Sequence, residues 1–335
     1  MELLDTATRD AVLKSLHRMR LIDAGADVQL TPLTGGVSSL ILRVDHQGQR
    51  FCVKRSLPQL KVAAVWNAPV ERNRAEVDWL RLAAQPCPHA VPAILGQDHE
   101  GCAFAMAYLD PESYPVWKTS LRDGLVRRQD AESVGDVLAR IHAHAARQPG
   151  LAERFAHDED FYALRLEPYF AASALRHPDR AEALQRLITT TQQTRHTLMH
   201  GDISPKNILF GPQGPVLLDA ECACWGDAAF DLAFVLNHLL LKTVWRPLHT
   251  DDYLSAFQAL AQTYLSQVTW ENVPALERRT SDLIAGMLLA RVDGKSPAEY
   301  ITQADDQERV RRCARDLLQQ PALTLAELQQ RWMTT

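Results

Sequence analysis

The sequence has no excess of positive charge and no long apolar run, and each absence argues against a class of protein. Its 36 Lys and Arg are outnumbered by 41 Asp and Glu, which leaves a formal net charge of −5. No overall positive field therefore attracts nucleic acid or an anionic membrane. No uninterrupted apolar stretch approaches the roughly 18–20 residues that span a bilayer, and the acids within residues 1–10 are untypical of a secretory signal. We expect a cytoplasmic protein with neither nucleic acid nor membrane as a partner.

Cysteine is also scarce. The six cysteines are Cys52, Cys87, Cys102, Cys222, Cys224 and Cys313. Only Cys222 and Cys224 are close in sequence, and a single intervening residue is not a usual zinc or redox spacing. We expect buried, reduced thiols.

The composition is that of an ordinary globular protein. Hydrophobic residues make up 46% and charged residues 23% of 335 residues, which suits one large domain or two modest lobes.

The first third of the chain has mainly strand patterns. The segment 28–53 has strand-like apolar residues on either side of the turn formers His46 to Gln49, which predicts a hairpin. Helical spacing over 6–21 and 71–84 predicts two helices, and the apolar run 102–109 predicts a strand. Pro111 and Pro115 then interrupt the pattern. We expect a small, β-rich lobe over residues 1–109.

Residues 110–335 have mainly helical patterns. Helical spacing predicts helices over 131–146, 161–172, 181–194, 230–241, 253–267, 275–289 and 307–319. Pro168 is expected to kink or shorten the second of these, and short strands are expected around a loop within 198–218. The fold class is therefore α+β, with a small β-rich N-terminal lobe and a larger, mostly helical C-terminal lobe.

The most informative stretch runs from Leu198 to Asp219. Asp202 and Asn207 lie in a proline-containing loop between apolar runs, and Asp219 follows the strand-like 216–218. Phosphoryl transfer from a nucleotide needs one carboxylate beside the attacking hydroxyl, with oxygen ligands for magnesium close by. We expect Asp202 to be the catalytic base and Asn207 and Asp219 to bind the metal.

Three further residues lie close to this set in the sequence. Glu221 could contact a second metal or the substrate, or face solvent. Asp231, at the start of a predicted helix, could hold the backbone of the loop or be an ordinary acid of a first helical turn. His200 is expected to be a packed scaffold residue, because Asp202 already supplies the base.

These motifs resemble the aminoglycoside phosphotransferase and choline kinase superfamily, which is related to the protein kinases. The matching residues are His200-Gly201-Asp202 through Asn207, Asp219-x-Glu221, and Gly226-Asp227 through Asp231-Leu232-Ala233. Residues 53–58, Trp66, Glu71-Arg72 and 219–226 are similar to the methylthioribose kinase branch. That branch lacks an asparagine at position 207 and has longer chains, so the resemblance, which covers about residues 30–241, points to the superfamily more than to one substrate. It implies a bilobal, protein-kinase-like fold that uses ATP and Mg²⁺.

The resemblance also implies a nucleotide-binding N-terminal lobe. Lys54 on a predicted strand would neutralise phosphate charge, and Glu76 on the next helix would be its ion-pair partner. Backbone groups of the loop around Gly35, Gly36, Ser38 and Ser39 would approach the phosphates. Met106 and Tyr108 lie where the hinge would contact the adenine.

Features that would select the acceptor are sparser. Arg291 could point towards the cleft or be a cation at a helix C-terminus. The acidic run 158–160 could suit an aminoglycoside or be a solvated segment. An aromatic cage for choline could include Trp225, with Trp245, Tyr264 and Trp270 as further candidates.

We therefore expect an ATP-dependent phosphotransferase that acts on a hydroxyl of a small-molecule substrate, with a sugar or sugar-like alcohol favoured. The alternatives are an aminoglycoside or amino-alcohol phosphotransferase and a catalytically silent nucleotide-binding module. A protein kinase is disfavoured, since Gly201 replaces the arginine that contacts an activation-loop phosphate, and Asp219 is followed by Ala-Glu instead of Phe-Gly. The oligomeric state is open.

Overall fold

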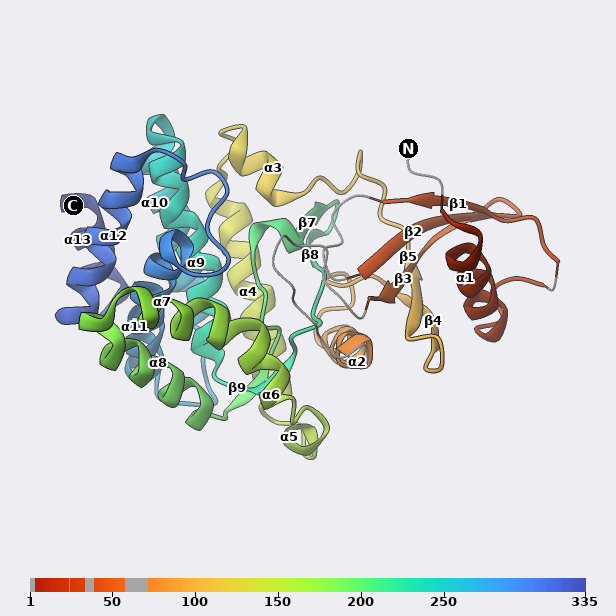
Figure 1. Cartoon of the computed structure of the whole chain (residues 1–335), viewed down its shortest axis with the longest axis horizontal. Helices are drawn as coiled ribbons and strands as arrows, with labels where there is room; N and C mark the ends of the chain where they lie inside the picture. The colour runs from red at the N-terminus through yellow and green to blue at the C-terminus, as the bar shows by residue number, and fades with distance from the viewer. Residues whose placement is uncertain (1–3, 24, 34–38, 58–71) are drawn as a thin grey trace.

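A computed structural model describes residues 4–23, 25–33, 39–57 and 72–335 of the chain. It places an antiparallel sheet at one end of the molecule and a large group of helices at the other (Figure 1). This is the α+β, two-part arrangement that the sequence patterns predict.

The sheet has five strands in the order β1-β2-β3-β5-β4, each antiparallel to its neighbour. Its strands are β1 (Gln29–Pro32), β2 (Ser39–His46), β3 (Gln49–Ser56), β4 (Ile94–Asp98) and β5 (Ala103–Ala107). The predicted hairpin is β2–β3. Gln47 and Gly48 connect the two strands with φ values of 50° and 77°, as the commonest two-residue hairpin turn requires.

The two faces of β3 contact different partners because side chains alternate along a strand. Phe51 and Val53 pack with α1 (Thr6–Arg18) in a small hydrophobic cluster that includes Val12 and Leu16. Lys54 lies on the opposite face and contacts Glu76 of α2 (Arg72–Ala83). The sheet thus presents its one buried lysine to the side on which the helical part begins.

After β5 the chain passes through the two prolines and enters α3 (Trp117–Arg122) and α4 (Arg128–Ala145). The hairpin of β7 (Ile208–Gly211) and β8 (Gly214–Leu217) lies between the sheet and the helices (Figure 1). Strand β6 (Thr197–Met199) pairs with β9 (Cys224–Gly226) within the helical part. The remaining helices are α5 (Leu151–Arg154), α6 (Asp158–Phe161), α7 (Ala172–Arg176), α8 (Ala181–Gln193), α9 (Ala228–Trp245), α10 (Thr250–Leu265), α11 (Val273–Asp293), α12 (Ala304–Gln319) and α13 (Leu325–Thr334). Short 3₁₀ turns cover Pro178–Arg180, Pro205–Asn207 and Pro247–His249.

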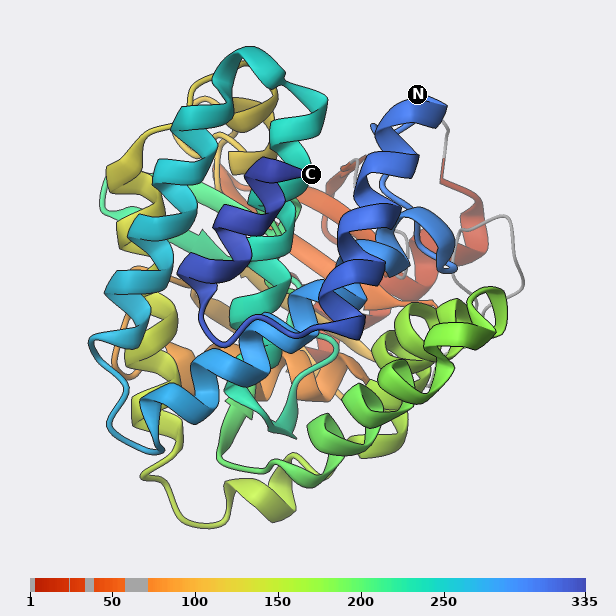
Figure 2. The same ribbon diagram turned by 90° about the vertical axis from the view of Figure 1, so that its left-hand side faces the viewer.

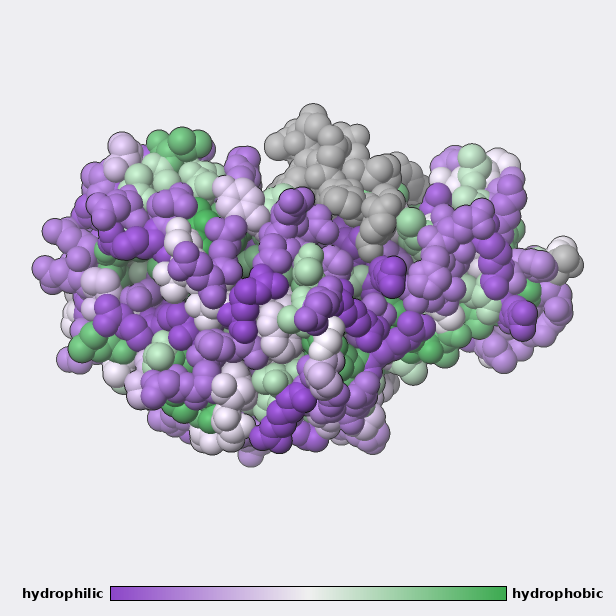
Figure 3. Space-filling view, turned by 90° about the horizontal axis from the view of Figure 1, so that it is seen from below, coloured by the Kyte–Doolittle hydropathy of each residue, from purple (hydrophilic) through white to green (hydrophobic). Residues whose placement is uncertain are grey.

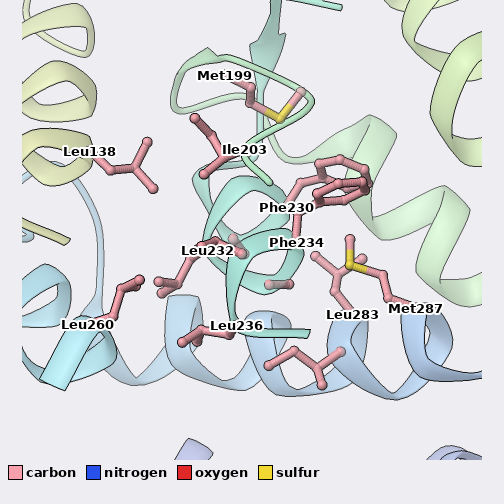
Figure 4. Close-up of a cluster of buried hydrophobic side chains, with 14 of the residues drawn as sticks. Leu138, Met199, Ile203, Phe230, Leu232, Phe234, Leu236, Leu260, Leu283 and Met287 are labelled. Atoms are coloured by element: carbon pink, nitrogen blue, oxygen red, sulfur yellow. The ribbon is translucent and has the colours of Figure 1, made fainter. Parts of the chain in front are cut away.

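Helix α9 is the centre of the helical part, with α10 and α11 packed beside it (Figure 2). Its Phe230, Leu232, Phe234 and Leu236 lie among side chains from the surrounding elements (Figure 4). Those side chains are Leu138, Met199, Ile203, Leu260, Leu283 and Met287. Because α9 is covered on all sides, most of its residues are apolar.

Helix α9 is also, in the described part of the chain, the one helix long and apolar enough to cross a membrane by length and composition alone. Of its 18 residues, 94% are buried inside the protein. Hydrophilic residues cover most of the molecular face in Figure 3. The apolar composition of α9 is therefore accounted for by its position in the core.

Several expectations need correction. The helix predicted over 161–172 is mostly η1 (Tyr162–Ala171), a π-helix that runs through Pro168 and continues into α7. A proline cannot donate the normal helical hydrogen bond, and a wider turn accommodates it. Strands β4 and β9 and helices α3, α5 and α13 have no counterpart in the sequence-based prediction. Five cysteines are buried thiols as expected, but Cys102 is half-buried, in a tight turn with φ of 46°.

Candidate active site

The loop over residues 200–207 connects β6 to β7, and the first turn of α9 holds its backbone through hydrogen bonds. The Asp231 carboxylate accepts hydrogen bonds from the backbone N–H groups of His200 (2.6 Å) and Gly201 (2.8 Å). It also lies 3.2 Å from Nε2 of His142 on α4. Asp231 is completely buried, so its role is to hold the loop.

Gly201 has a conformation that only glycine adopts without strain. Its φ is 78°, and a Cβ atom at this position would lie 2.6 Å from the carbonyl oxygen of Cys222. The glycine in the His-Gly-Asp motif thus allows the loop to pass close to the segment after β8.

His200 is buried and forms hydrogen bonds through both ring nitrogens. Its Nε2 lies 3.0 Å from the Leu218 carbonyl and its Nδ1 accepts from the Asp202 N–H at 3.2 Å. This pattern assigns the proton to Nε2 of a neutral ring. Burial lowers the pKa of His200, which agrees with a scaffold role. Trp79 of α2 packs edge-on against the ring, with the centroids 4.7 Å apart.

The Asp202 carboxylate is surrounded by donors. Its Oδ2 accepts from Asn207 Nδ2 at 2.9 Å and forms ion pairs with Arg165 (3.0 Å) and Lys206 (3.2 Å). Arg165 also donates to the Gly201 carbonyl at 2.6 Å. Sequence reasoning missed Arg165, because it lies 37 residues before Asp202 in an irregular helix and belongs to no motif.

Asn207 and Asp219 come together through the β7–β8 hairpin. The register pairs Ile208 with Leu217, and the N–H of Leu218 donates to the Asn207 carbonyl at 2.9 Å. Asn207 precedes β7 and Asp219 follows β8, so the two residues are neighbours at the same end of the hairpin. Asp219 has a φ of 69°, which is uncommon for a residue other than glycine and is typical of functional positions.

Lys54 bridges the sheet and the β7–β8 hairpin. Its ammonium lies 2.7 Å from a Glu76 oxygen and 2.5 Å from Oδ1 of Asp219. Burial alone would lower the pKa of Lys54, but the charges of Asp219 and Glu76 outweigh burial and raise it. Burial raises the pKa of Glu76 to about 7. For Asp219 the charge of Lys54 outweighs burial, so its pKa is lowered. Asp219 therefore remains ionised.

Glu221 does not face solvent. Its carboxylate accepts from Nε of Arg72 at 3.0 Å in a buried pair, and Arg72 also donates to the Leu57 carbonyl at 2.9 Å. This pair connects the start of α2 to the segment after β8.

The donor set is compatible with a divalent cation. Asn207 directs its amide nitrogen to Asp202, which leaves its Oδ1 without a donor among the described residues, and Oδ2 of Asp219 is likewise without one. Carboxylate and amide oxygens suit Mg²⁺. In the described ranges, no group of three or more His, Cys, Asp or Glu side chains could hold a metal ion. A metal ion at this place would therefore need the amide oxygen of Asn207 as a ligand.

The predicted nucleotide contacts are described in part. Gly35, Gly36 and Ser38 lie outside the described residues. Ser39 begins β2, and its buried hydroxyl has no hydrogen-bond partner within the described ranges. Met106 lies in β5 opposite Cys52, and the Tyr108 ring lies under the guanidinium groups of Arg43 and Arg50.

A cavity of about 160 Å³ lies beside Asp202, and we call it the acceptor pocket. Arg291, on the last turn of α11, contributes to its wall. The other positively charged wall residues, all missed by sequence reasoning, are Lys118, Lys206 and Lys242.

The candidate aromatic residues do not form one cage. Trp225 is not part of the described wall of the acceptor pocket, because β9 directs it against the large hydrophobic cluster. Tyr264 and Trp270 pack around His142, whereas Trp245 stacks on Tyr300. The acidic run 158–160 forms the short helix α6, where Asp158 forms an ion pair with Arg195.

Comparisons with known proteins identify related sequences. The model of a family described as "Phosphotransferase enzyme family" matches residues 29–242. The methylthioribose kinase of Pectobacterium atrosepticum is 24% identical over 248 residues, which cover 62% of this chain and 58% of that protein. The chain thus aligns with little more than half the length of that relative.

Two solved structures have a similar fold. A choline/ethanolamine kinase family protein from Mesorhizobium loti aligns with a TM-score of 0.55 at 15% identity, covering 97% of this chain and 100% of its own. An amicoumacin kinase in complex with AMP-PNP and Ca²⁺ aligns with a TM-score of 0.55 at 15% identity, covering 90% and 91%.

Proposed function

Because this chain belongs to the phosphotransferase enzyme family, we propose that it is an ATP-dependent kinase that phosphorylates a hydroxyl group of a small sugar or sugar-like alcohol. In this proposal residues 1–109 form the nucleotide-binding lobe and residues 110–335 the catalytic and substrate-binding lobe. The methylthioribose kinases among its relatives, and a nucleotide analogue bound by the similarly folded amicoumacin kinase, support the same reaction class.

The observation that carries the proposal is the convergence of Lys54, Asp202 and Asp219. These residues come from β3, the 200–207 loop and the end of β8, yet Lys54 contacts Asp219 directly and Asn207 connects to both the loop and the hairpin. An ordinary structural ion-pair network does not need an open cavity beside one of its carboxylates, and Asp202 has one.

The reaction assigns a role to each group. Asp202 accepts the proton of the acceptor hydroxyl while a bond forms between that oxygen and the γ-phosphorus of ATP. The bond from the γ-phosphorus to the β,γ-bridging oxygen breaks, ADP leaves, and Asp202 releases the proton to solvent. Lys54, oriented by Glu76, neutralises phosphate charge. Asn207 and Asp219 would hold Mg²⁺, and Glu221 is a candidate ligand for a second metal ion. When bound, the metal would neutralise charge at the phosphates.

The test is turnover by the full chain with ATP and MgCl₂, measured as ADP release against panels of sugars, polyols, sugar acids, amino alcohols and aminoglycosides. Asp202→Asn should reduce kcat by about 10²- to 10⁴-fold, because the variant cannot accept the proton. Binding of AMP-PNP, measured by calorimetry, should be retained.

Asp305→Asn is the matched control. It makes the same chemical change at an exposed position on α12 and should leave kcat unchanged. Wild-type turnover in Asp202→Asn would overturn the assigned base. Binding of AMP-PNP without turnover of any compound in the panels would favour a nucleotide-binding module instead.

A further inference from the structure

The acceptor pocket contains more positive than negative charge. Four cationic side chains contribute to its wall, against the carboxylates of Asp202 and Glu299. Both carboxylates already have a cation: Lys206 lies 3.2 Å from Asp202, and Lys118 contacts Glu299. Lys242 and Arg291 have no carboxylate partner among the described residues.

Arg291 is held in place by neutral oxygens. It is 7% exposed, and its Nη1 donates to the backbone carbonyl and the hydroxyl of Ser296. The Nε atom of Arg291 is buried without a hydrogen-bond partner in the part of the chain that the structure describes. A buried guanidinium without a counter-ion costs free energy unless a ligand supplies the missing charge.

Lys242 is a second buried cation without a counter-ion in contact among the described residues, and it is more deeply buried than Arg291. It extends from α9 and is 1% exposed, and its ammonium makes neither a hydrogen bond nor an ion pair within the described ranges. Its ammonium lies 4.8 Å from the ring centroid of Tyr300 and 5.7 Å from that of Trp245. These cation–π contacts compensate for part of the lost hydration, but they leave the charge without an anion.

Neutral donors with no partner lie on the same wall. The Ser204 hydroxyl, on the loop that carries Asp202, and the Tyr300 hydroxyl are both buried without a hydrogen-bond partner among the described residues. Native proteins rarely leave several buried polar groups unsatisfied in one place. A ligand that accepts hydrogen bonds and carries negative charge would satisfy all four groups.

We propose that the acceptor carries an anionic oxyacid group, a carboxylate or a phosphate, which binds between Lys242 and Arg291 while its hydroxyl faces Asp202. This inference rests on the proposed function and narrows it to acidic sugars and acidic polyols. It disfavours aminoglycosides and choline, because their ammonium groups would be repelled by the two unpaired cations.

The size of the pocket agrees with a small acceptor. An engineered cavity of about 150 Å³ holds benzene, and the acceptor pocket has about 160 Å³. One short polyol chain or a single sugar ring fits such a volume. Phe234 and Tyr169, also in the wall, offer apolar surface for the C–H groups of such a molecule.

The test compares five-carbon acceptors that are neutral, anionic or cationic. Ribitol, ribonate, ribose 5-phosphate and 1-amino-1-deoxyribitol are each titrated with the full chain, both for binding by calorimetry without nucleotide and for ADP release with ATP and MgCl₂. We expect the anionic members to bind and react at least 30-fold more efficiently than ribitol, and the amine to be the poorest. Preference for ribonate or for ribose 5-phosphate distinguishes a carboxylate site from a phosphate site.

Two variants assign the effect to the pocket. Lys242→Met keeps an apolar chain of similar length and should weaken binding of the preferred anion by about 30-fold or more, which is typical of removing one partner of a buried charge pair. Binding of ribitol should change little. Lys295→Met is the matched control. It removes the same charge at a side chain that is 56% exposed and outside the described pocket wall, and it should leave anion binding unchanged.

A pH profile provides a second readout. Burial, followed by the charge of Lys118, lowers the pKa of Lys242 to about 7. Because an anion binds the protonated amine, affinity should be highest below pH 7 and decrease as the pH rises above it. This dependence should disappear in Lys242→Met. The titratable or charged groups that face Lys242 are Lys118, His238, Arg291, Glu299 and Tyr300.

The outcomes separate the two proposals. Binding of anions that depends on Lys242, with no turnover, would support the anion site and overturn the proposed function. Efficient turnover of ribitol, with a KM that Lys242→Met does not change, would support the proposed function and overturn the anion site. Anion binding that Lys242→Met and Lys295→Met weaken equally would also overturn it.

Discussion

At the scale of single residues, the polar groups around Asp202 divide into satisfied and unsatisfied ones. Asp231 and His200 have their hydrogen bonds completed within the protein. Lys242 and Ser204 do not, and both face the acceptor pocket. Proteins tolerate such groups where a ligand completes them, at a cost in stability while the ligand is absent.

That cost can be measured with Lys242→Met. The pKa of Lys242 is about 7 in the folded chain and near 10.5 in an unfolded one, so the unfolded state binds more protons between these values. The wild type should therefore gain stability as the pH rises from 7 to 10. The variant lacks this gain. Its midpoint of thermal unfolding should therefore be higher than that of the wild type, and the difference should be largest at pH 7 or below.

The measurement is thermal unfolding of both proteins from pH 6 to pH 10 without ligand. Lys295→Met should behave like the wild type throughout. A Lys242→Met protein that is less stable than the wild type at pH 7 would show that the ammonium is well accommodated in the folded state.

At the scale of elements, helix α9 connects the core to the chemistry. Its first turn supplies Asp231 to the 200–207 loop, and its last turns bring Lys242 to the acceptor pocket. One rigid, buried helix therefore determines the positions of the loop and of the pocket wall together.

Asp231→Asn tests this connection. An asparagine can accept only one of the two backbone hydrogen bonds with full strength, and it loses the charge beside His142. We expect kcat to fall at least 10-fold, faster hydrogen exchange at residues 200 and 201, and a loss of about 1–3 kcal/mol in the free energy of unfolding.

Asp98→Asn controls for the general cost of changing a buried carboxylate. Asp98 ends β4, is buried and pairs with Arg18 of α1, away from the loop. The variant should lose stability and keep its kcat. A normal kcat in Asp231→Asn would show that the loop does not need this support.

At the scale of the whole molecule, α2 joins the sheet to the helical part. Glu76 of this helix contacts Lys54 on β3, while Trp79 belongs to the large hydrophobic cluster and packs against His200. The sheet has its own smaller cluster beneath α1. The buried helix α2 therefore connects the two parts, together with the Lys54–Asp219 ion pair and the segment with the two prolines.

Trp79→Ala should lower the free energy of unfolding by about 3–5 kcal/mol, as is typical of removing a large buried side chain. AMP-PNP affinity of the protein that remains folded should also fall, because Trp79 supports both α2 and His200. Phe257→Ala on α10 creates a comparable cavity in the same cluster and should reduce stability without this loss of affinity. Equal nucleotide affinities in the two variants, measured by calorimetry where both are folded, would contradict the role of α2.

Local sequence information determined the elements and the order of the reactive residues. The turn at Gln47-Gly48, the alternation along β3 and the spacing from Asp202 to Asn207 to Asp219 depend on neighbours in the chain, so they could be predicted. The short edge strand β4 and the π-helix around Pro168 could not, because tertiary packing outweighs weak local preferences there.

Only the tertiary structure decided which distant charges share a pocket. Lys118 and Lys242 of the pocket wall lie on two different helices, and nothing in their local patterns relates them to Asp202. A net charge of −5 spread over the chain gives no indication of a positively charged cavity, since the sign of the charge in a pocket depends on which few side chains the fold directs inward. The motif could therefore be recognised in the sequence, whereas the electrostatic character of the pocket beside it follows from packing.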